Sequence, residues 1–337
     1  MSKETRPTSR AFLASSPGGV GGGVRVSCRC GVSLRFMLHH DAKTSPLVQI
    51  NEKGGASALI ANAFPLPVGP LESGGSCDAT TAACVDCYAG GLEARAPQYG
   101  DGASVNLANL EHLKACGGQS AVSSALWAIV QHSEQQQRAR GVARPSFRWH
   151  SGGDIFATWY GRAIRSAVLA SPDVVHWIYT RDAVKVKSLL PAPDNLSVYL
   201  SADGENVVKM AKAGHKLGLP LAMLADDDRH AVALWARAAA AAPVVSAVVC
   251  PVSGKWARDG LGVSAHVVGI DSTGRGRRAL AARDSVGAGA CVACLVCLPV
   301  GKVRGVTFLL HGGKNTGKTA GRLGAAVSVR LRRAVVS

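Results

Sequence analysis

The chain has 337 residues, of which 47% are apolar, which is enough for one large domain or two modest ones. No stretch approaches the roughly 18 consecutive uncharged apolar residues that a membrane span needs, so we expect no membrane partner. Lys and Arg total 38 against 22 Asp and Glu, a net charge of +16. Such a charge attracts polyanions, of which nucleic acid is the obvious one, and a basic surface without a dedicated ligand is the equal alternative.

Residues 1–45 are predicted to be a flexible leader rich in glycine and serine. This segment has no apolar region long enough for a signal peptide, so we expect a cytoplasmic protein with reduced thiols. In a reducing compartment, clustered cysteines indicate metal or redox chemistry rather than disulfides. Cys28 and Cys30 in this leader, and Cys116 further on, are assigned no role.

Residues 46–250 are predicted to form a domain in which strands and helices alternate. A first strand is expected at 57–64, and two helices are expected at 106–117 and 121–141. Apolar, β-rich runs then end every 21 to 30 residues, with helical stretches between them, which is the pattern of βαβ units and a parallel sheet. The runs cover 146–150, 174–180, 195–201, 219–225 and 244–250, and the helical stretches cover 156–170, 182–190, 205–218 and 228–242.

Polar residues follow nearly every strand predicted in this domain. His150 begins one such segment, Arg181 and Asp203 belong to the next two, and Asp226 begins a fourth. We therefore predict an α/β fold built as a full or partial (β/α) barrel with parallel strands, in preference to a doubly wound sheet. Barrel enzymes build their active sites at the carboxyl ends of the strands, so His150, Arg181 and Asp203 are expected to contact a cofactor or substrate in catalysis.

The C-terminal third is predicted to be a metal-binding extension. Residues 251–312 combine a basic insert with a cysteine-rich segment and a last strand at 303–311, and 313–337 form a basic tail. The cysteines follow a C-x2-C-x2-C spacing, and an upstream Cys-Pro completes a set of four, as in bacterial ferredoxin loops. These cysteines are Cys291, Cys294, Cys297 and Cys250. We expect Cys250 to lie beside the other three; zinc and buried free cysteines are the alternatives to an iron–sulfur cluster.

The segment 312–319, GGKNTGKT, matches the phosphate-binding P-loop formally. A P-loop opens its nucleotide-binding domain, and the acidic strand that binds Mg²⁺ comes later in the chain. Only 18 residues follow Thr319, and they contain no acidic residue. A flexible basic tail is therefore the preferred interpretation, and phosphate binding is the alternative.

A second cysteine motif, CDATTAACVDCY, places Cys77, Cys84 and Cys87 after the first predicted strand. It resembles the three-cysteine loop of radical S-adenosylmethionine enzymes, in which three thiolates hold a [4Fe–4S] cluster and the open iron binds the cofactor. The first gap here is six residues rather than three, and Asp86 precedes the third cysteine. Zinc is the alternative metal, with His112 or Cys116 as a fourth ligand.

The segment FRWHSGGDIF carries a Gly-Gly-acid turn after the second predicted strand. In radical S-adenosylmethionine enzymes such a turn seats the amino group of the cofactor, a role that this resemblance assigns to Gly152, Gly153 and Asp154. The glycines would let a ligand approach the backbone, and the carboxylate would pair with an ammonium group. An ordinary turn with Asp154 as a helix N-cap is the alternative.

The order of these motifs resembles the phage-associated gene product 88 domain family across roughly residues 55–312. The shared features are an apolar AFPLP segment, the first cysteine loop, the strand ends, the Cys-Pro and the closing cysteines. The resemblance implies a radical-S-adenosylmethionine-like barrel with a C-terminal cysteine cluster. The chain departs from the family pattern in the second glycine of HSGGD and in the long basic insert at 254–289.

Two functional hypotheses follow. The leading one is a cytoplasmic iron–sulfur protein of the radical S-adenosylmethionine type, with a reactive cluster on the first three cysteines and a second, fully ligated cluster on the last four. The other is a non-catalytic zinc protein that binds nucleic acid through its basic C-terminal region. Residues 255–337 carry 14 Lys and Arg against three Asp, which supports a basic contact surface there.

Overall fold

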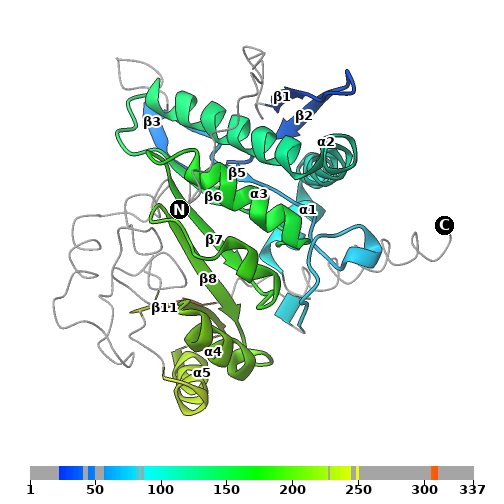
Figure 1. Ribbon diagram of the computed structural model, residues 1–337. Coiled ribbons are helices and arrows are strands. Elements are labelled where there is room, and N and C mark those ends of the chain that lie inside the picture. The colour runs from blue at the N-terminus through cyan, green and yellow to red at the C-terminus, as the bar shows by residue number, and fades with distance from the viewer. Residues whose placement is uncertain are drawn as a thin grey trace, which may run out of the picture.

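The computed structural model describes residues 23–40, 45–49, 57–81, 83–84, 87–226, 228–243, 248–249 and 305–309. Within these ranges the protein is a mixed α/β structure organised around a parallel sheet (Figure 1). None of the described helices combines the length and the apolar composition needed to cross a bilayer.

Five strands of the sheet lie side by side in chain order, and each pairs in parallel with the next. They are β5 (Ala63–Phe64), β6 (Ser146–Trp149), β7 (Val175–Thr180), β8 (Leu196–Ala202) and β9 (Leu221–Ala225). β11 (Gly305–Leu309) then pairs in parallel with β9, and β10 (Val248–Val249) pairs with β11. The α/β fold with a parallel sheet is confirmed. A full barrel, one of the two forms predicted, is not formed by the described strands, because no pairing joins β5 to β10 at the two ends of the order. The partial barrel stays a prediction.

Helices connect the strands. They are α1 (Tyr88–Arg95), α2 (Pro97–Arg138), α3 (Thr158–Leu169), the 3-10 helix η3 (Lys185–Leu189), α4 (Val207–Leu217) and α5 (Asp228–Ala241). α2 packs against α3, and α4 packs against α5, so the two pairs cover opposite ends of the row of strands (Figure 1). α3 presents Tyr160, Ile164 and Val168 at i, i+4 and i+8 to the core, and all three are fully buried.

One continuous hydrophobic core lies between these helices and the sheet. It contains Trp149, Ile178, Val198 and Met223 from successive strands, together with Ile164 of α3. Because side chains alternate along a strand, the neighbouring residues Val175 and Trp177 of β7 form a separate buried cluster with Tyr179. The β-branched and aromatic composition of β7 suits a strand that is buried on both faces.

Two elements of the structure differ in detail from those predicted from the sequence. The single strand expected at 57–64 is divided into β4 (Ser57–Leu59), which pairs antiparallel with β3 (Leu47–Gln49), and β5 of the main sheet. The two helices expected at 106–117 and 121–141 are the halves of α2, which is interrupted at Gly118 (φ 68°, ψ −164°). Only glycine adopts such a backbone conformation readily, so the interruption falls there.

The N-terminal segment differs most from its expectation. Residues 23–37, expected to belong to a flexible leader, form an antiparallel hairpin of β1 (Gly23–Ser27) and β2 (Ser33–Met37). Val24 and Val26 alternate with exposed residues, as do Leu34 and Phe36, and all four side chains join the main core. The glycine-rich surroundings concealed this period-two pattern, and this part of the leader is folded.

Candidate functional site

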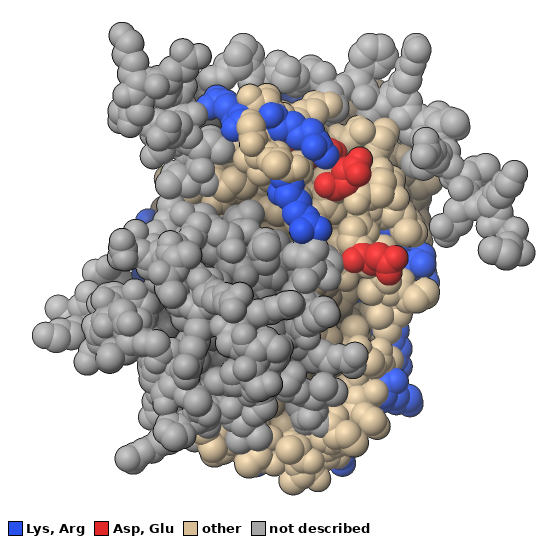
Figure 2. Space-filling view, turned by 90° about the vertical axis from the view of Figure 1, so that its left-hand side faces the viewer, with Lys and Arg blue, Asp and Glu red and all other residues tan. Residues whose placement is uncertain are grey.

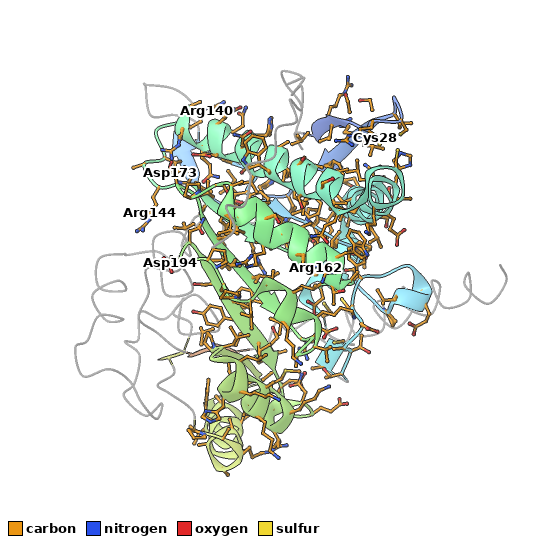
Figure 3. All side chains as sticks on the ribbon, in the orientation of Figure 1. Cys28, Arg140, Arg144, Arg162, Asp173 and Asp194 are labelled. Carbon is orange, nitrogen blue, oxygen red and sulfur yellow. The ribbon has the colours of Figure 1, made fainter. Side chains whose placement is uncertain are left out.

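The carboxyl ends of neighbouring strands bring the predicted catalytic residues to one edge of the sheet. His150 follows β6, Arg181 follows β7 and Asp203 follows β8. Parallel strands that pair in register end on the same side, so the segments after them are neighbours. The opposite, amino-terminal edge is marked by Arg144, Asp173 and Asp194, which precede the same three strands (Figure 3).

The first cysteine loop is joined to this edge by a polar network. Thr81, which lies between Cys77 and Cys84, donates a hydrogen bond from Oγ1 to Asp203 Oδ2 over 2.6 Å. Arg181 donates from Nη1 to Thr81 Oγ1 over 2.8 Å and also forms an ion pair with Asp203. Burial raises the pKa of Asp203, but the hydrogen bonds from Thr81 and Arg181 outweigh it and hold that pKa below its ordinary value.

A second ion pair holds the beginning of the loop. Lys185 of η3 contacts Asp78, the residue after Cys77, and donates to Asp182 Oδ2 over 2.8 Å. Burial raises the pKa of Asp182, but the hydrogen bond from Lys185 helps to keep it below the ordinary value. The loop is therefore held to the segment after β7 at two points, Asp78 and Thr81.

The three thiols of this loop are partly buried and lie near one another. Burial raises the pKa of Cys77 above its ordinary value, and negative charge on Asp154, Cys87 and Cys84 raises it further. Burial likewise raises the pKa of Cys87, which the cation of Arg181 partly offsets. Thr81 donates its backbone N–H to Cys84 Sγ over 3.3 Å. The structure thus gathers all three predicted ligands near Arg181 and Asp154.

The glycine turn after β6 packs tightly against the base of the same loop. A Cβ atom on Gly153 would lie 2.2 Å from Ser76 Oγ, and one on Gly152 would lie 2.7 Å from the Tyr99 hydroxyl. Gly153 also has a φ of 81°. Close packing against other parts of the protein therefore explains why both positions are glycine, in addition to the cofactor contact expected from the sequence.

Asp154 is buried at the centre of this arrangement. Its Oδ1 accepts a hydrogen bond from the backbone N–H of Ile155 over 2.7 Å, and its Oδ2 accepts one from that of Arg181 over 2.8 Å. Burial raises the pKa of Asp154, while these hydrogen bonds oppose the shift. The carboxyl group therefore links the ends of β6 and β7 directly.

His150 has an unusual backbone for a residue with a side chain. Its φ is 62°, in the left-handed region, and its ring is buried. Nε2 lies 2.9 Å from the Tyr160 hydroxyl, while Nδ1 has no hydrogen-bond partner among the described residues. Burial, with a smaller contribution from Arg148, lowers the pKa of His150 to about 3, so the ring is neutral at neutral pH.

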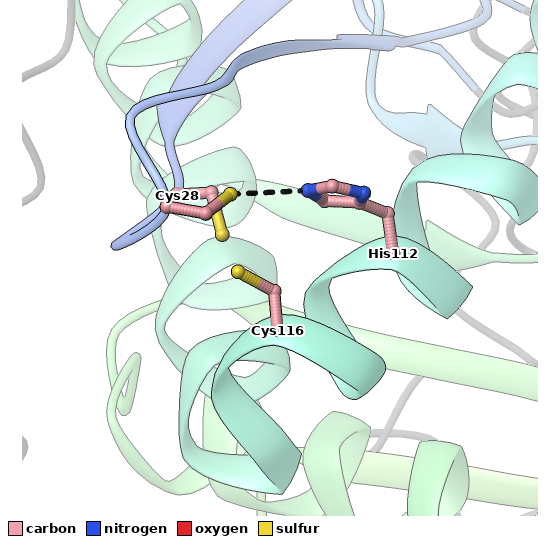
Figure 4. A group of neighbouring side chains, drawn as sticks. Cys28, His112 and Cys116 are labelled. Carbon is pink, nitrogen blue, oxygen red and sulfur yellow. Dashed lines mark hydrogen bonds between the residues drawn. The ribbon is translucent and has the colours of Figure 1, made fainter.

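A second group of candidate ligands was missed by the sequence analysis. Cys28, Cys30, His112 and Cys116 place one ligand atom each within 4.8 Å of one another, and this Cys3His group could bind a metal ion (Figure 4). His112 and Cys116, considered above as zinc ligands alongside the first cysteine loop, belong to this group instead. The available signals were the C-x-C spacing and the i, i+4 spacing of His112 and Cys116.

The remaining predictions lie outside the described residues. They concern Cys250, Cys291, Cys294, Cys297 and the segment 312–319. The basic C-terminal region is described only at 305–309, so nucleic-acid binding through it stays a prediction. On the described part of the face in Figure 2, basic side chains lie close to acidic ones.

In the part of the chain that the structure describes, the protein is thus an α/β protein with a cysteine loop at the carboxyl edge of its sheet and a Cys3His group that joins the β1–β2 turn to α2. It belongs to the gene product 88 family, whose model matches residues 34–293. No curated protein and no solved structure matches the chain.

Proposed function

We propose that this chain is an iron–sulfur enzyme of the radical S-adenosylmethionine type, in which Cys77, Cys84 and Cys87 hold a [4Fe–4S] cluster. The observation that carries the proposal is the position of this loop. It follows the first strand of a parallel sheet, and it is held over the carboxyl edge by Arg181 and Asp203 through Thr81. Enzymes built on parallel strands place their chemistry at that edge.

The donor set fits a cluster better than a single ion. Three thiolates leave one iron of a four-iron cluster without a protein ligand, and an open coordination position is what a catalytic metal requires. A single tetrahedral ion draws its ligand atoms close together, whereas a cluster spreads the thiolates over different irons. Among the described residues, ligand atoms grouped within 4.8 Å of one another occur in the Cys3His group and not in this loop.

Residues around the loop have separate tasks in this proposal. Arg181, whose cation interacts with Cys84 and Cys87, stabilises negative charge on the thiolates. Thr81 and Asp203 fix the loop, and Asp203 holds the Arg181 side chain in place. Asp154, beside Cys77, accepts hydrogen bonds from Ile155, Arg181 and Thr180, which leaves one carboxylate lone pair to accept a hydrogen bond from the ammonium group of S-adenosylmethionine. When bound, the cluster would supply the electron that cleaves this cofactor reductively.

The test is purification under anaerobic conditions followed by analysis of iron and acid-labile sulfide. We expect a brown protein that absorbs at about 400 nm, as thiolate-ligated clusters do. After reduction, we also expect it to form 5′-deoxyadenosine from S-adenosylmethionine. Cys84→Ser should lose the iron and colour of this cluster together with all cofactor cleavage, whereas iron held by Cys250, Cys291, Cys294 and Cys297 in the predicted second cluster should remain. Cys116→Ser, the same substitution in the other cysteine group, should retain all three.

A different set of results would contradict the proposal. A colourless protein that contains zinc on Cys77, Cys84 and Cys87 would support the non-catalytic alternative. Iron that remains unchanged in Cys84→Ser would show that this loop does not hold the cluster.

A further inference from the structure

We infer that Cys28, Cys30, His112 and Cys116 bind a single zinc ion that fastens the tip of the β1–β2 hairpin to α2. The site lies apart from the cysteine loop of the proposed active site, and the inference does not depend on the proposed function. Figure 3 places Cys28 at the hairpin beside α2. Two of the four donors, Cys28 and Cys30, precede the region that the family model matches.

Two local structures present the four donors. Cys28 and Cys30 lie in the turn of the hairpin, where Cys28 donates its N–H to Val32 O over 2.8 Å and Gly31 donates to Cys28 O over 3.0 Å. Gly31 has a φ of 86°, which lets the chain reverse tightly between the strands. His112 and Cys116 are four residues apart in α2 and therefore project from the same side of the helix (Figure 4).

The distances fit one ion. Zinc binds sulfur at about 2.3 Å and nitrogen at about 2.0–2.1 Å, so neighbouring ligand atoms of a tetrahedral site lie about 3.5–3.8 Å apart. Here Cys30 Sγ is 3.3 Å from His112 Nε2, and all four ligand atoms lie within 4.8 Å of one another. A four-iron cluster would need its ligands spread over separate irons. The space between these atoms suits one small ion.

The chemistry of the donors selects zinc and a structural role. Three thiolates and one imidazole are a recognised set for tetrahedral zinc, and four protein ligands leave no open position for a substrate. The exposed position of Cys30 gives the ion access from solvent, while Cys28 is buried against the core. The group therefore has the composition of a closed, structural site.

Two strands alone are marginally stable, so the hairpin depends on its contacts with the core and with α2. α2 contacts it along one side, in order from base to tip. Asn106 exchanges two hydrogen bonds with Met37, and Asn109 donates to Arg35 O over 2.8 Å. His112 and Cys116 continue the same side of the helix and reach the turn, where the zinc ion would join the two elements.

The test measures metal in the full-length protein, purified with a reductant that keeps thiols free. We expect about one zinc per chain, held by four protein ligands as in structural sites, and a thiolate-to-cobalt charge-transfer band after replacement by cobalt(II). Cys116→Ser should lose this zinc and the cobalt band. Cys84→Ser is the matched control and should retain both the zinc and the cobalt band, even where it loses iron. Failure of this inference can therefore be distinguished from failure of the proposed function.

A measurement on the unmodified chain guards against a variant that fails to fold. Removing zinc with a chelator should increase hydrogen exchange at the backbone amides of Cys28 and Gly31 while leaving β8 protected. The inference would be overturned if a folded Cys116→Ser variant kept its zinc, or if that variant lost iron and sulfide. A native disulfide among these cysteines would also overturn it. Unchanged exchange at the turn after zinc removal would also contradict the fastening role.

Discussion

At the scale of single residues, Gly153 shows how closely the expected cofactor turn is packed into the protein. Its backbone has a φ of 81°, and the space where a Cβ atom would lie is occupied by Ser76 Oγ at 2.2 Å and by Leu66 Cβ at 2.6 Å. Two separate penalties therefore oppose any side chain here. One is backbone strain in the left-handed region, and the other is a steric clash with the loop that leads to Cys77.

Gly153→Ala should lower the free energy of unfolding by about 3 kcal/mol or more, because strain and overpacking each cost about 1–3 kcal/mol. Gly141→Ala is the matched control, since Gly141 also has a positive φ (78°) but has nothing within 4 Å of the added atom. It should cost about 1 kcal/mol from strain alone. Urea unfolding of both variants measures the difference. Equal losses would show that the close approach of Ser76 is unimportant.

The residue types at the site could be predicted from the sequence, and some of their contacts could be predicted as well. Arg181 and Asp203 could be placed together because each follows a strand of one parallel sheet, and parallel strands end on one side. Their joint contact with Thr81 could not be inferred, because it depends on the path of a loop without regular structure. Nor does the printed sequence indicate that Asp154 bonds the backbone of Arg181.

At the scale of elements, the hairpin and α2 form a unit whose polar contacts differ greatly in burial. Asn106 is fully buried, and its side chain bonds the N–H and the carbonyl of Met37 and the carbonyl of Pro65, at 2.7, 2.9 and 2.9 Å. Asn109, one turn further along α2, makes a single exposed bond to Arg35 O. A buried polar group that loses its partner costs far more than an exposed one.

Asn106→Ala should lower the free energy of unfolding by about 2–4 kcal/mol, because it removes the Asn106 hydrogen bonds of the partly buried Met37 backbone and of the buried Pro65 carbonyl. Asn109→Ala, the same substitution on the same helix, should cost less than about 1 kcal/mol. Urea midpoints give the two values, and hydrogen exchange in β2 reports the hairpin separately. A small effect of Asn106→Ala would mean that apolar contacts alone hold the hairpin.

The elements that were predicted well are those with strong local patterns. β6 to β9 and the helices between them have apolar runs of the right length and period, so their positions were predicted to within about three residues. The largest difference is at η3, a 3-10 helix that begins at Lys185 rather than at residue 182. The hairpin was missed because its strands lie in glycine-rich sequence that was assigned to a flexible leader. The Cys3His group was missed with it. Cys30 and His112 are 82 residues apart, and docking of the hairpin alone brings them together.

At the scale of the whole molecule, buried neutral histidines make stability depend on pH. His176 is fully buried beside the rings of Phe147 and Trp149, and its Nε2 is 3.0 Å from Ser171 Oγ. Burial lowers its pKa to about 3, as it does for His150. Between about pH 6.5, the ordinary value, and pH 3, the unfolded chain binds protons that the folded chain does not, so stability falls as the pH falls. Asp154 acts in the opposite direction, because its pKa is raised.

His176→Phe should therefore change the pH dependence of unfolding as well as its free energy. At pH 7.5 the variant should be less stable by about 1 kcal/mol, because it loses the hydrogen bond to Ser171. At pH 5 the wild-type protein should have lost about 2 kcal/mol through protonation of His176 in the unfolded chain, a loss that the variant avoids. The variant should then equal or exceed the wild type. Ser171→Ala is the control: it removes the same hydrogen bond but retains the titrating ring, so its urea midpoints should keep the wild-type pH dependence. A constant difference between His176→Phe and the wild type from pH 7.5 to pH 5 would show that the pKa of His176 is the same in the folded and the unfolded chain.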